Sequence, residues 1–131
     1  MIVIDTSALL AIFFDETKRK EFSNLIDAFE ERFISAVSWV ELSIVVRHRL
    51  GNEAESRITQ KLMALPLEIV PVDVAQANLA RHAFAVYGKG RHPAGLNFGD
   101  CFAYALARQR NLPLLYQGND FARTDIEFPV V

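Results

Sequence analysis

The 131-residue sequence is 51% hydrophobic, which is enough for one compact domain with a core of its own. Its 14 lysine and arginine residues nearly balance 16 acidic residues, and the net charge of −2 excludes a globally basic nucleic-acid wrapper as well as a solvated acidic tail. The single cysteine excludes a disulfide framework and favours a reducing cytoplasm. We also expect neither a signal peptide nor a membrane span, because the start lacks a basic region and no apolar run is long enough.

No linker, repeat or low-complexity tract divides the chain, so we predict a single domain over residues 1–131. Short β-branched runs predict strands, while amphipathic segments behind capping residues predict helices. In chain order we expect a strand at 2–4, helices at 8–14 and 17–31, a strand at 33–35, helices at 38–49 and 52–65, a strand at 67–70, a helix at 73–87, a glycine-rich loop at 88–95, a helix at 98–110, a strand at 113–116 and an edge strand at 126–128. This alternation predicts an α/β fold with a parallel sheet covered by helices on both faces.

Two of the helix starts carry a capping-box pattern. Ser38 stands three residues before Glu41, and Asp73 stands three residues before Gln76. We therefore expect Ser38 and Asp73 to cap the helices that follow them.

Two acidic residues follow predicted strands. Asp5 comes directly after residues 2–4, where it either faces the crevice at the carboxyl edge of the sheet or caps the next helix. Asp120 and its neighbour Asn119 follow the strand at 113–116, where a turn role is the ordinary alternative.

Two further acids lie in helices that carry no other charge nearby. The segment around Glu41 is apolar nearly all round, so that helix should be buried and its carboxylate needs a cation, a metal or a proton. The alternative for Glu41 is the capping box. Asp100 begins the helix at 98–110, where it either faces inward or complements the helix dipole. The small Gly99 beside it indicates close packing on another element.

Chain order can bring these four acids to one edge of a parallel sheet. Grouped carboxylates raise one another's pKa, so an ionised cluster requires a cation. Oxygen ligands without histidine or cysteine favour Mg²⁺ or Mn²⁺, and such ions activate water and neutralise charge on a phosphodiester. The pattern therefore predicts metal-assisted phosphodiester chemistry.

Other polar residues stand near the predicted acids. Thr6 and Ser7 either hold metal-bound waters or a phosphate oxygen, or cap a helix, and Asn97 either contacts the scissile phosphate, orients Asp100 or caps its helix. Lys89 and Arg91 lie in the glycine-rich loop and are candidates for contacts with the phosphates of a phosphodiester substrate.

Four segments of the chain, in order, resemble the PIN-domain ribonucleases and most closely the VapC toxins of bacterial type II toxin–antitoxin pairs. They are residues 3–9, beginning Val-Ile-Asp-Thr-Ser, residues 38–42, residues 96–107, beginning Leu-Asn-Phe-Gly-Asp-Cys-Phe, and residues 114–121, ending Gly-Asn-Asp-Phe. The resemblance implies a three-layer α/β/α fold with a central, mainly parallel sheet of four to five strands. It also implies a Mg²⁺-dependent endoribonuclease that acts on RNA in a bacterial cytoplasm, forms a homodimer and is neutralised by a VapB-type antitoxin.

Carried over by residue, the resemblance implies that Asp5 and Asp100 are the principal metal ligands and that Glu41 completes the acidic pocket. Family members often have Gly-Asp-Asp-Phe where this chain has Gly-Asn-Asp-Phe, so the fourth catalytic acid is either lost at Asn119 or supplied by Asp120. Asp120 is assigned the role.

Two other functions stay open from the sequence. A degenerate, non-catalytic PIN-like module that binds RNA or protein would account for Asn119. A phosphatase with Asp5 as its nucleophile is the third hypothesis, although that chemistry usually has a second aspartate where this chain has Ser7.

Overall fold

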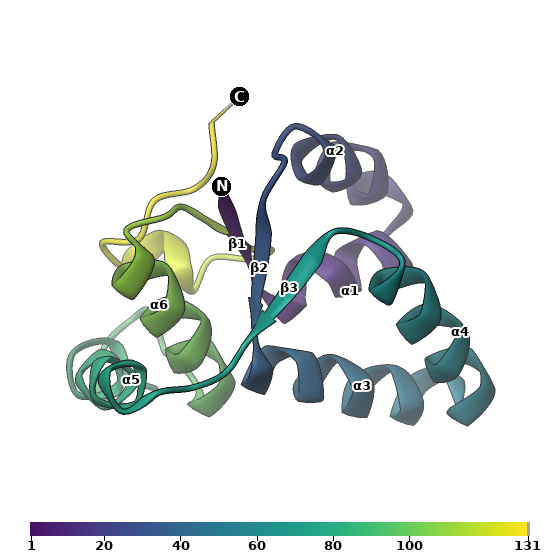
Figure 1. Cartoon of the computed structure of the whole chain (residues 1–131). Coiled ribbons are helices and arrows are strands. Elements are labelled where there is room, and N and C mark those ends of the chain that lie inside the picture. Colours follow the sequence, from purple (N-terminus) through teal and green to yellow (C-terminus); the bar gives the residue numbers. More distant parts are fainter. Residues whose placement is uncertain (131) are drawn as a thin grey trace.

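The computed structural model describes residues 1–130 and contains four parallel strands and six α-helices among them (Figure 1). The strands are β1 (Ile2–Ile4), β2 (Arg32–Ser35), β3 (Leu67–Val70) and β4 (Leu114–Leu115). The helices are α1 (Thr6–Phe14), α2 (Glu16–Asp27), α3 (Ala36–Leu50), α4 (Asn52–Met63), α5 (Val74–Tyr87) and α6 (Phe98–Arg110), and a short 3-10 helix, η1, spans Phe121–Arg123. None of the helices in these 130 residues is long and apolar enough to cross a bilayer.

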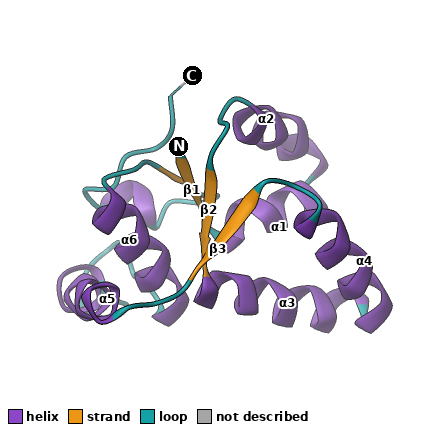
Figure 2. Ribbon diagram, in the orientation of Figure 1, coloured by secondary structure: helices purple, strands orange, loops and turns teal. Residues whose placement is uncertain are grey.

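The sheet has the strand order β3-β2-β1-β4 and separates two layers of helices (Figure 2). Successive side chains of a strand point to opposite faces, so Val3 packs toward α5 and α6, whereas Ile2 and Ile4 pack toward the helices α1 to α4. All three side chains are almost fully buried. The predicted three-layer α/β/α fold with a parallel sheet is confirmed, and the sheet has four strands.

The register of the sheet aligns the carboxyl ends of its two central strands. Val3 pairs with Phe33 of β2 and with Leu114 of β4, and Ile4 pairs with Leu115. All pairs are parallel, so the residues that follow β1, β2 and β4 leave the sheet at the same edge. Asp5 is the first residue beyond β1 at that edge.

Helix α3 differs from its prediction at its start and in its burial. Its N-cap is Ser35, whose hydroxyl accepts a hydrogen bond from the Val37 N–H (3.2 Å), so the predicted cap at Ser38 is wrong. Glu41 consequently lies in the second turn and takes no part in a capping box. The expectation of a helix buried all round is also wrong, because Val40 is 56% exposed and Ile44 59% exposed on its outer face.

Two other helices end earlier than expected, and one predicted strand is absent. Helix α2 ends at Asp27, and just before this end the Ile26 carbonyl accepts hydrogen bonds from both the Phe29 N–H (3.2 Å) and the Arg32 side chain (2.8 Å). Helix α4 ends at Met63. The predicted edge strand at 126–128 does not form: with only two residues in β4, this segment makes a single backbone bond, from the Leu114 N–H to the Glu127 carbonyl (2.9 Å).

Candidate active site

Asp5 is both the N-cap of α1 and a buried carboxylate at the edge of the sheet. Its Oδ2 accepts hydrogen bonds from the Ser7 N–H (3.0 Å) and the Ser7 hydroxyl (2.5 Å). Its Oδ1 is buried without a hydrogen-bond partner, and the residue is only 2% exposed. Burial raises the pKa of Asp5 to about 6. The capping role is confirmed, and it leaves one carboxylate oxygen free to accept a ligand.

Asp100 closes a reciprocal capping box at the start of α6. Its backbone N–H donates to the Asn97 side chain (2.9 Å), and its Oδ2 accepts from the Asn97 N–H (3.0 Å). Burial raises the pKa of Asp100 to about 7, assisted by the negative charges of Asp5, Asp120 and Glu41. Asp5, Glu41 and Asp120 therefore lie close enough to Asp100 to act on it electrostatically. Asn97 caps α6, which is one of the roles predicted for it, and its N–H holds the Asp100 carboxylate.

Glu41 reaches this group across the contact between α3 and α6. Its carboxylate lies against Gly99, and a Cβ added to Gly99 would overlap Glu41 Oε2. Gly99 is buried, so the close packing predicted from its small size is confirmed. An alanine at position 99 would displace the Glu41 carboxylate from its place.

Asp120 and Asn119 lie on the exposed turn that follows β4. Gly118 has a φ of +103°, which lets the chain turn there, and Asp120 then precedes η1. The charge of Asp120 contributes to the raised pKa of Asp100. The acid of this turn that lies near Asp100 is therefore Asp120.

Thr6 and Ser7 connect the end of β1 to its neighbours. The Thr6 hydroxyl donates to the Ser38 carbonyl in α3 (2.9 Å). The Ser7 hydroxyl, besides donating to Asp5, accepts from the Gln117 N–H beyond β4 (3.0 Å). Both side chains thus hold the loops around Asp5 in place.

Lys89 and Arg91 lie on the exposed surface of the loop between α5 and α6. A bridge between Gly88 and Leu96 closes this loop, and the Lys89 N–H donates to the Leu96 carbonyl (2.9 Å). Both side chains stay in solvent, outside the carboxylate group. The loop leads directly into the cap of α6.

Two contacts of the C-terminal segment were not predicted. The Tyr104 hydroxyl donates to Asp125 (2.5 Å), and Arg123 donates to the Pro93 carbonyl (3.0 Å). The partners are far apart in the sequence, so no local pattern signals either contact. Tyr104 itself is almost fully buried.

The carboxylates present fit a divalent cation that keeps part of its hydration shell. Within residues 1–130, no three His, Cys, Asp or Glu side chains stand close enough together to enclose a metal ion as placed. Mg²⁺ does not need such a cage, because it is usually held by one or two carboxylates together with water and substrate phosphates. The unpartnered Asp5 Oδ1 and the neighbouring acid Asp100 supply that chemistry.

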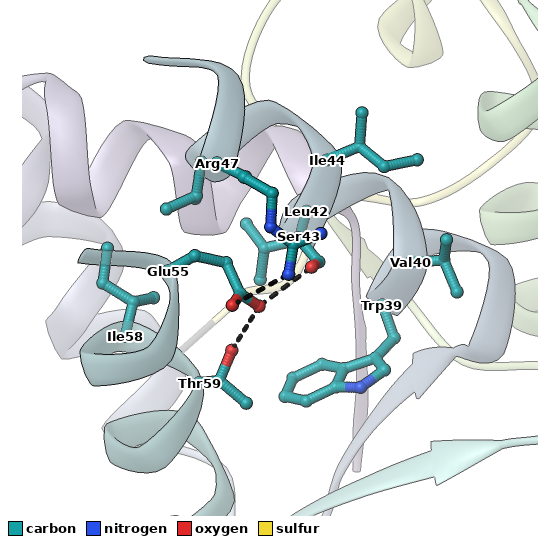
Figure 3. A pocket seen from close by; sticks show the side chains of 10 residues that line it. Trp39, Val40, Leu42, Ser43, Ile44, Arg47, Glu55, Ile58 and Thr59 are labelled. Atoms are coloured by element: carbon teal, nitrogen blue, oxygen red, sulfur yellow. Dashed lines mark hydrogen bonds and ion pairs between the residues drawn. The ribbon is translucent and has the colours of Figure 1, made fainter. Parts of the chain in front are cut away.

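A separate cavity of about 210 Å³ lies between α3 and α4 (Figure 3). Its polar end is Glu55, whose carboxylate accepts hydrogen bonds from Ser43 (2.8 Å), Thr59 (2.8 Å) and Arg47 (3.2 Å). These bonds, that of Ser43 first, hold the pKa of Glu55 below its usual value. None of the four predicted acids lines this cavity. The hydrogen bonds of Glu55 with Ser43 and Arg47 instead join α4 to α3.

Comparison with known proteins assigns the family. The PIN domain model matches residues 2–127. The chain is 42% identical to Ribonuclease VapC30 of Mycobacterium tuberculosis over 95% of each chain, and 42% identical to Ribonuclease VapC of Mycolicibacterium smegmatis over 95% of this chain and 97% of that one. The chain therefore belongs to the PIN-domain family, in the branch of the VapC ribonucleases.

Solved structures share the fold at lower sequence identity. The crystal structure of Mycobacterium tuberculosis VapC20, a sarcin–ricin loop cleaving toxin, superposes with a TM-score of 0.79 over 96% of each chain at 15% identity. A toxin–antitoxin complex from Klebsiella pneumoniae contains a chain with a TM-score of 0.72 and 20% identity, covering 95% of this chain and 93% of that one. At these identities the likeness establishes the fold alone.

Proposed function

We propose that this protein is the toxin of a type II toxin–antitoxin pair and cleaves RNA phosphodiester bonds with Mg²⁺, or alternatively Mn²⁺, at the acidic edge of its sheet. The observation that carries the proposal is the buried Asp5 Oδ1, which has no hydrogen-bond partner and lies in a group of mutually interacting acids. A buried carboxylate oxygen without a partner is costly unless a cation or proton compensates it. Membership of the VapC ribonucleases supports RNA as the substrate.

The residues that would hold the metal are Asp5 and Asp100, with Glu41 beside them. When bound, the ion would lower the pKa of a water molecule and neutralise charge on the phosphate. Ser7 holds one oxygen of Asp5 and leaves the other free, while the Asn97 N–H holds Oδ2 of Asp100. Both carboxylates are thus oriented before any ligand arrives.

Other residues would act on the substrate side of the site. Asp120 serves as the fourth acid, and Asn119 lies next to it on the same exposed turn. Lys89 and Arg91 would attract RNA phosphates, because cationic side chains supply much of the affinity for nucleic acids. Their exposed loop leads into the helix that carries Asp100.

Two protein partners complete the proposal, in a bacterial cytoplasm. A VapB-type antitoxin is supported by solved neighbours of this fold that are toxin–antitoxin complexes. A second copy of the chain is supported by exposed aromatic surface, since Phe98 is 73% exposed and Phe84 43% exposed beside a groove of about 610 Å³ between α5 and α6. Exposed apolar patches of this kind commonly mark protein interfaces.

The proposal is tested by RNA cleavage with matched single substitutions. Asp5→Asn keeps an oxygen that can cap α1, and Asp100→Asn keeps one that can accept from the Asn97 N–H, but both remove the negative charge. We therefore expect both variants to lose cleavage of total bacterial RNA in Mg²⁺ and to lose growth inhibition when induced. Asp27→Asn, at an exposed position of α2, is the control and should cleave like wild type. EDTA should stop the wild-type reaction, and excess Mn²⁺ should restart it.

Cleavage that survives in both folded variants would remove these residues from the mechanism. A wild-type protein that binds RNA without cutting it would favour the non-catalytic module, for which Asn119 is the supporting observation. Covalent phosphate trapped on Asp5 would favour the phosphatase.

A further inference from the structure

One arginine joins the basic loop to the turn that carries Asp120. Arg123 Nη1 donates to the Pro93 carbonyl in the loop between α5 and α6, at 3.0 Å. The Arg123 N–H also donates to the Asp120 carbonyl (3.3 Å). The loop and the acidic turn are therefore linked through Arg123, although they are separated by about a quarter of the chain.

The same two segments are anchored a second time through the core. The rings of His92 and Tyr87 meet edge to face at 5.1 Å, and Tyr87 lies 5.8 Å from Tyr104. The Tyr104 hydroxyl then donates to Asp125 (2.5 Å). These contacts tie the base of the loop to Asp125, just beyond η1, and the Arg123 bond joins the exposed part of the loop at Pro93 to the end of η1.

The link has a consequence for substrate binding. Lys89 and Arg91 lie on the loop that Arg123 holds, and they are the basic residues proposed to meet the RNA. Cations contribute to phosphate binding only if they are held where the phosphates pass, and ordering a free loop costs conformational entropy at the moment of binding. A bond that orders the loop beforehand removes part of that cost.

We propose that Arg123 is a positioning residue for RNA binding. Through its bond to the Pro93 carbonyl, it holds Lys89 and Arg91 in a fixed position relative to the acidic turn. This inference rests on the proposed function. The acceptor is a backbone carbonyl, so the link depends on the donor at position 123 and on the path of the loop. The guanidinium is the residue type that offers several fixed donors at once.

The first experiment needs no RNA. Hydrogen exchange is measured on the free protein for wild type, for Arg123→Met, which keeps the length of the side chain, and for Arg57→Met, a control at an exposed position of α4. We expect amides in residues 88–96 to exchange several-fold faster in Arg123→Met and to be unchanged in the control. Equal exchange in all three proteins would overturn the proposal.

The second experiment separates binding from chemistry. On a pool of short randomised single-stranded RNAs with a dye at one end and a quencher at the other, Arg123→Met should raise KM about fivefold, as expected for the loss of one hydrogen bond, with kcat within about twofold. Arg123→Lys, which keeps a donor, should recover part of the KM. A fall in kcat at constant KM would overturn the positioning role.

A direct phosphate contact by Arg123 gives a different result. In that case Arg123→Met would remove one phosphate contact and lower the slope of log RNA affinity against log salt concentration by about 0.7. Exchange in the loop would stay as in wild type. That outcome would also overturn the proposal. If wild type cleaves no RNA at all, the proposed function fails, while the exchange experiment still decides whether Arg123 holds the loop.

Discussion

Asp5 and Asp100 show how one carboxylate serves a helix and a candidate metal site together. A helix start needs a side-chain oxygen to accept a free backbone N–H, and a carboxylate has two oxygens. At Asp5 the oxygen Oδ2 binds Ser7, and Oδ1 is left buried and unpartnered. The capping and ligand interpretations drawn from the sequence are therefore compatible, and the cap itself orients the oxygen that would bind a cation.

The raised pKa of Asp100 predicts how the metal-free protein responds to pH. In the folded protein this pKa is about 7, against 3.8 for an ordinary aspartate, so ionising the group costs stability as the pH rises through about 7. Asp100→Asn removes that cost and should stabilise the metal-free protein at about pH 8 by about 1 kcal/mol, or about 4 °C, once solvent screening at this half-buried position is allowed for. Near pH 4 the difference should vanish. Thermal unfolding in EDTA across this pH range measures it.

Asp5, whose pKa is raised by its own burial, still titrates in the Asp100→Asn variant, so the pH dependence should flatten without disappearing. Excess Mn²⁺ at about pH 8 should stabilise wild type much more than the variant. An Asp100→Asn variant that is less stable than wild type at high pH would show that ionising the Asp100 carboxyl group does not lower the stability of the fold.

The place of the Glu41 carboxylate beside α6 depends on the absence of a side chain at Gly99. In Gly99→Ala, the added methyl group would meet the flexible end of Glu41, while alanine favours a helix over glycine by about 1 kcal/mol. We therefore expect the variant to unfold at the same temperature as wild type or higher, yet to cleave RNA as poorly as Glu41→Ala. The double variant should lose no further activity, because both changes act through the same carboxylate. Additive losses in the double variant would contradict this coupling.

Apart from the edge strand at 126–128, the predicted element types are present, whereas several element ends differ from the prediction. Ser35 and Ser38 are both suited to cap a helix, and the choice falls on Ser35 because β2 ends there with an extended backbone. The alternation of Ile126, Glu127 and Phe128 resembles a strand, but a strand also needs a partner of matching length, and β4 supplies only two residues. Tertiary partners of this kind cannot be read from a local pattern.

Across the whole molecule, the parallel sheet gathers residues from distant parts of the chain at one edge. The acids at positions 5, 41, 100 and 120 could be singled out from the sequence, because each lacks a nearby opposite charge or follows a strand. Their grouping at one edge followed from chain order in a parallel sheet, and their individual roles were implied by the resemblance to PIN-domain ribonucleases. The contacts of Arg123 with Pro93 and of Tyr104 with Asp125 could not be predicted, because they depend on how the C-terminal segment returns to the loop before α6.

The net charge of the chain does not by itself identify a ligand. An excess of acids seemed to disfavour a nucleic acid, yet four of the 16 acids gather in one group around Asp100. If these four serve a cation, the rest of the chain has 14 basic residues against 12 acidic ones. Where the charges lie decides which ligand the protein can take.

A calorimetric titration of the RNA-free protein with Mn²⁺ near neutral pH tests whether the acidic edge is a metal site. We expect saturable binding by wild type and by Asp27→Asn, accompanied by release of protons from the carboxyl groups whose pKa values are raised. Asp5→Asn and Asp100→Asn, if folded, should bind far more weakly. Equal Mn²⁺ binding by all four proteins, or none by wild type, would contradict the assignment of this edge as the metal site of a ribonuclease.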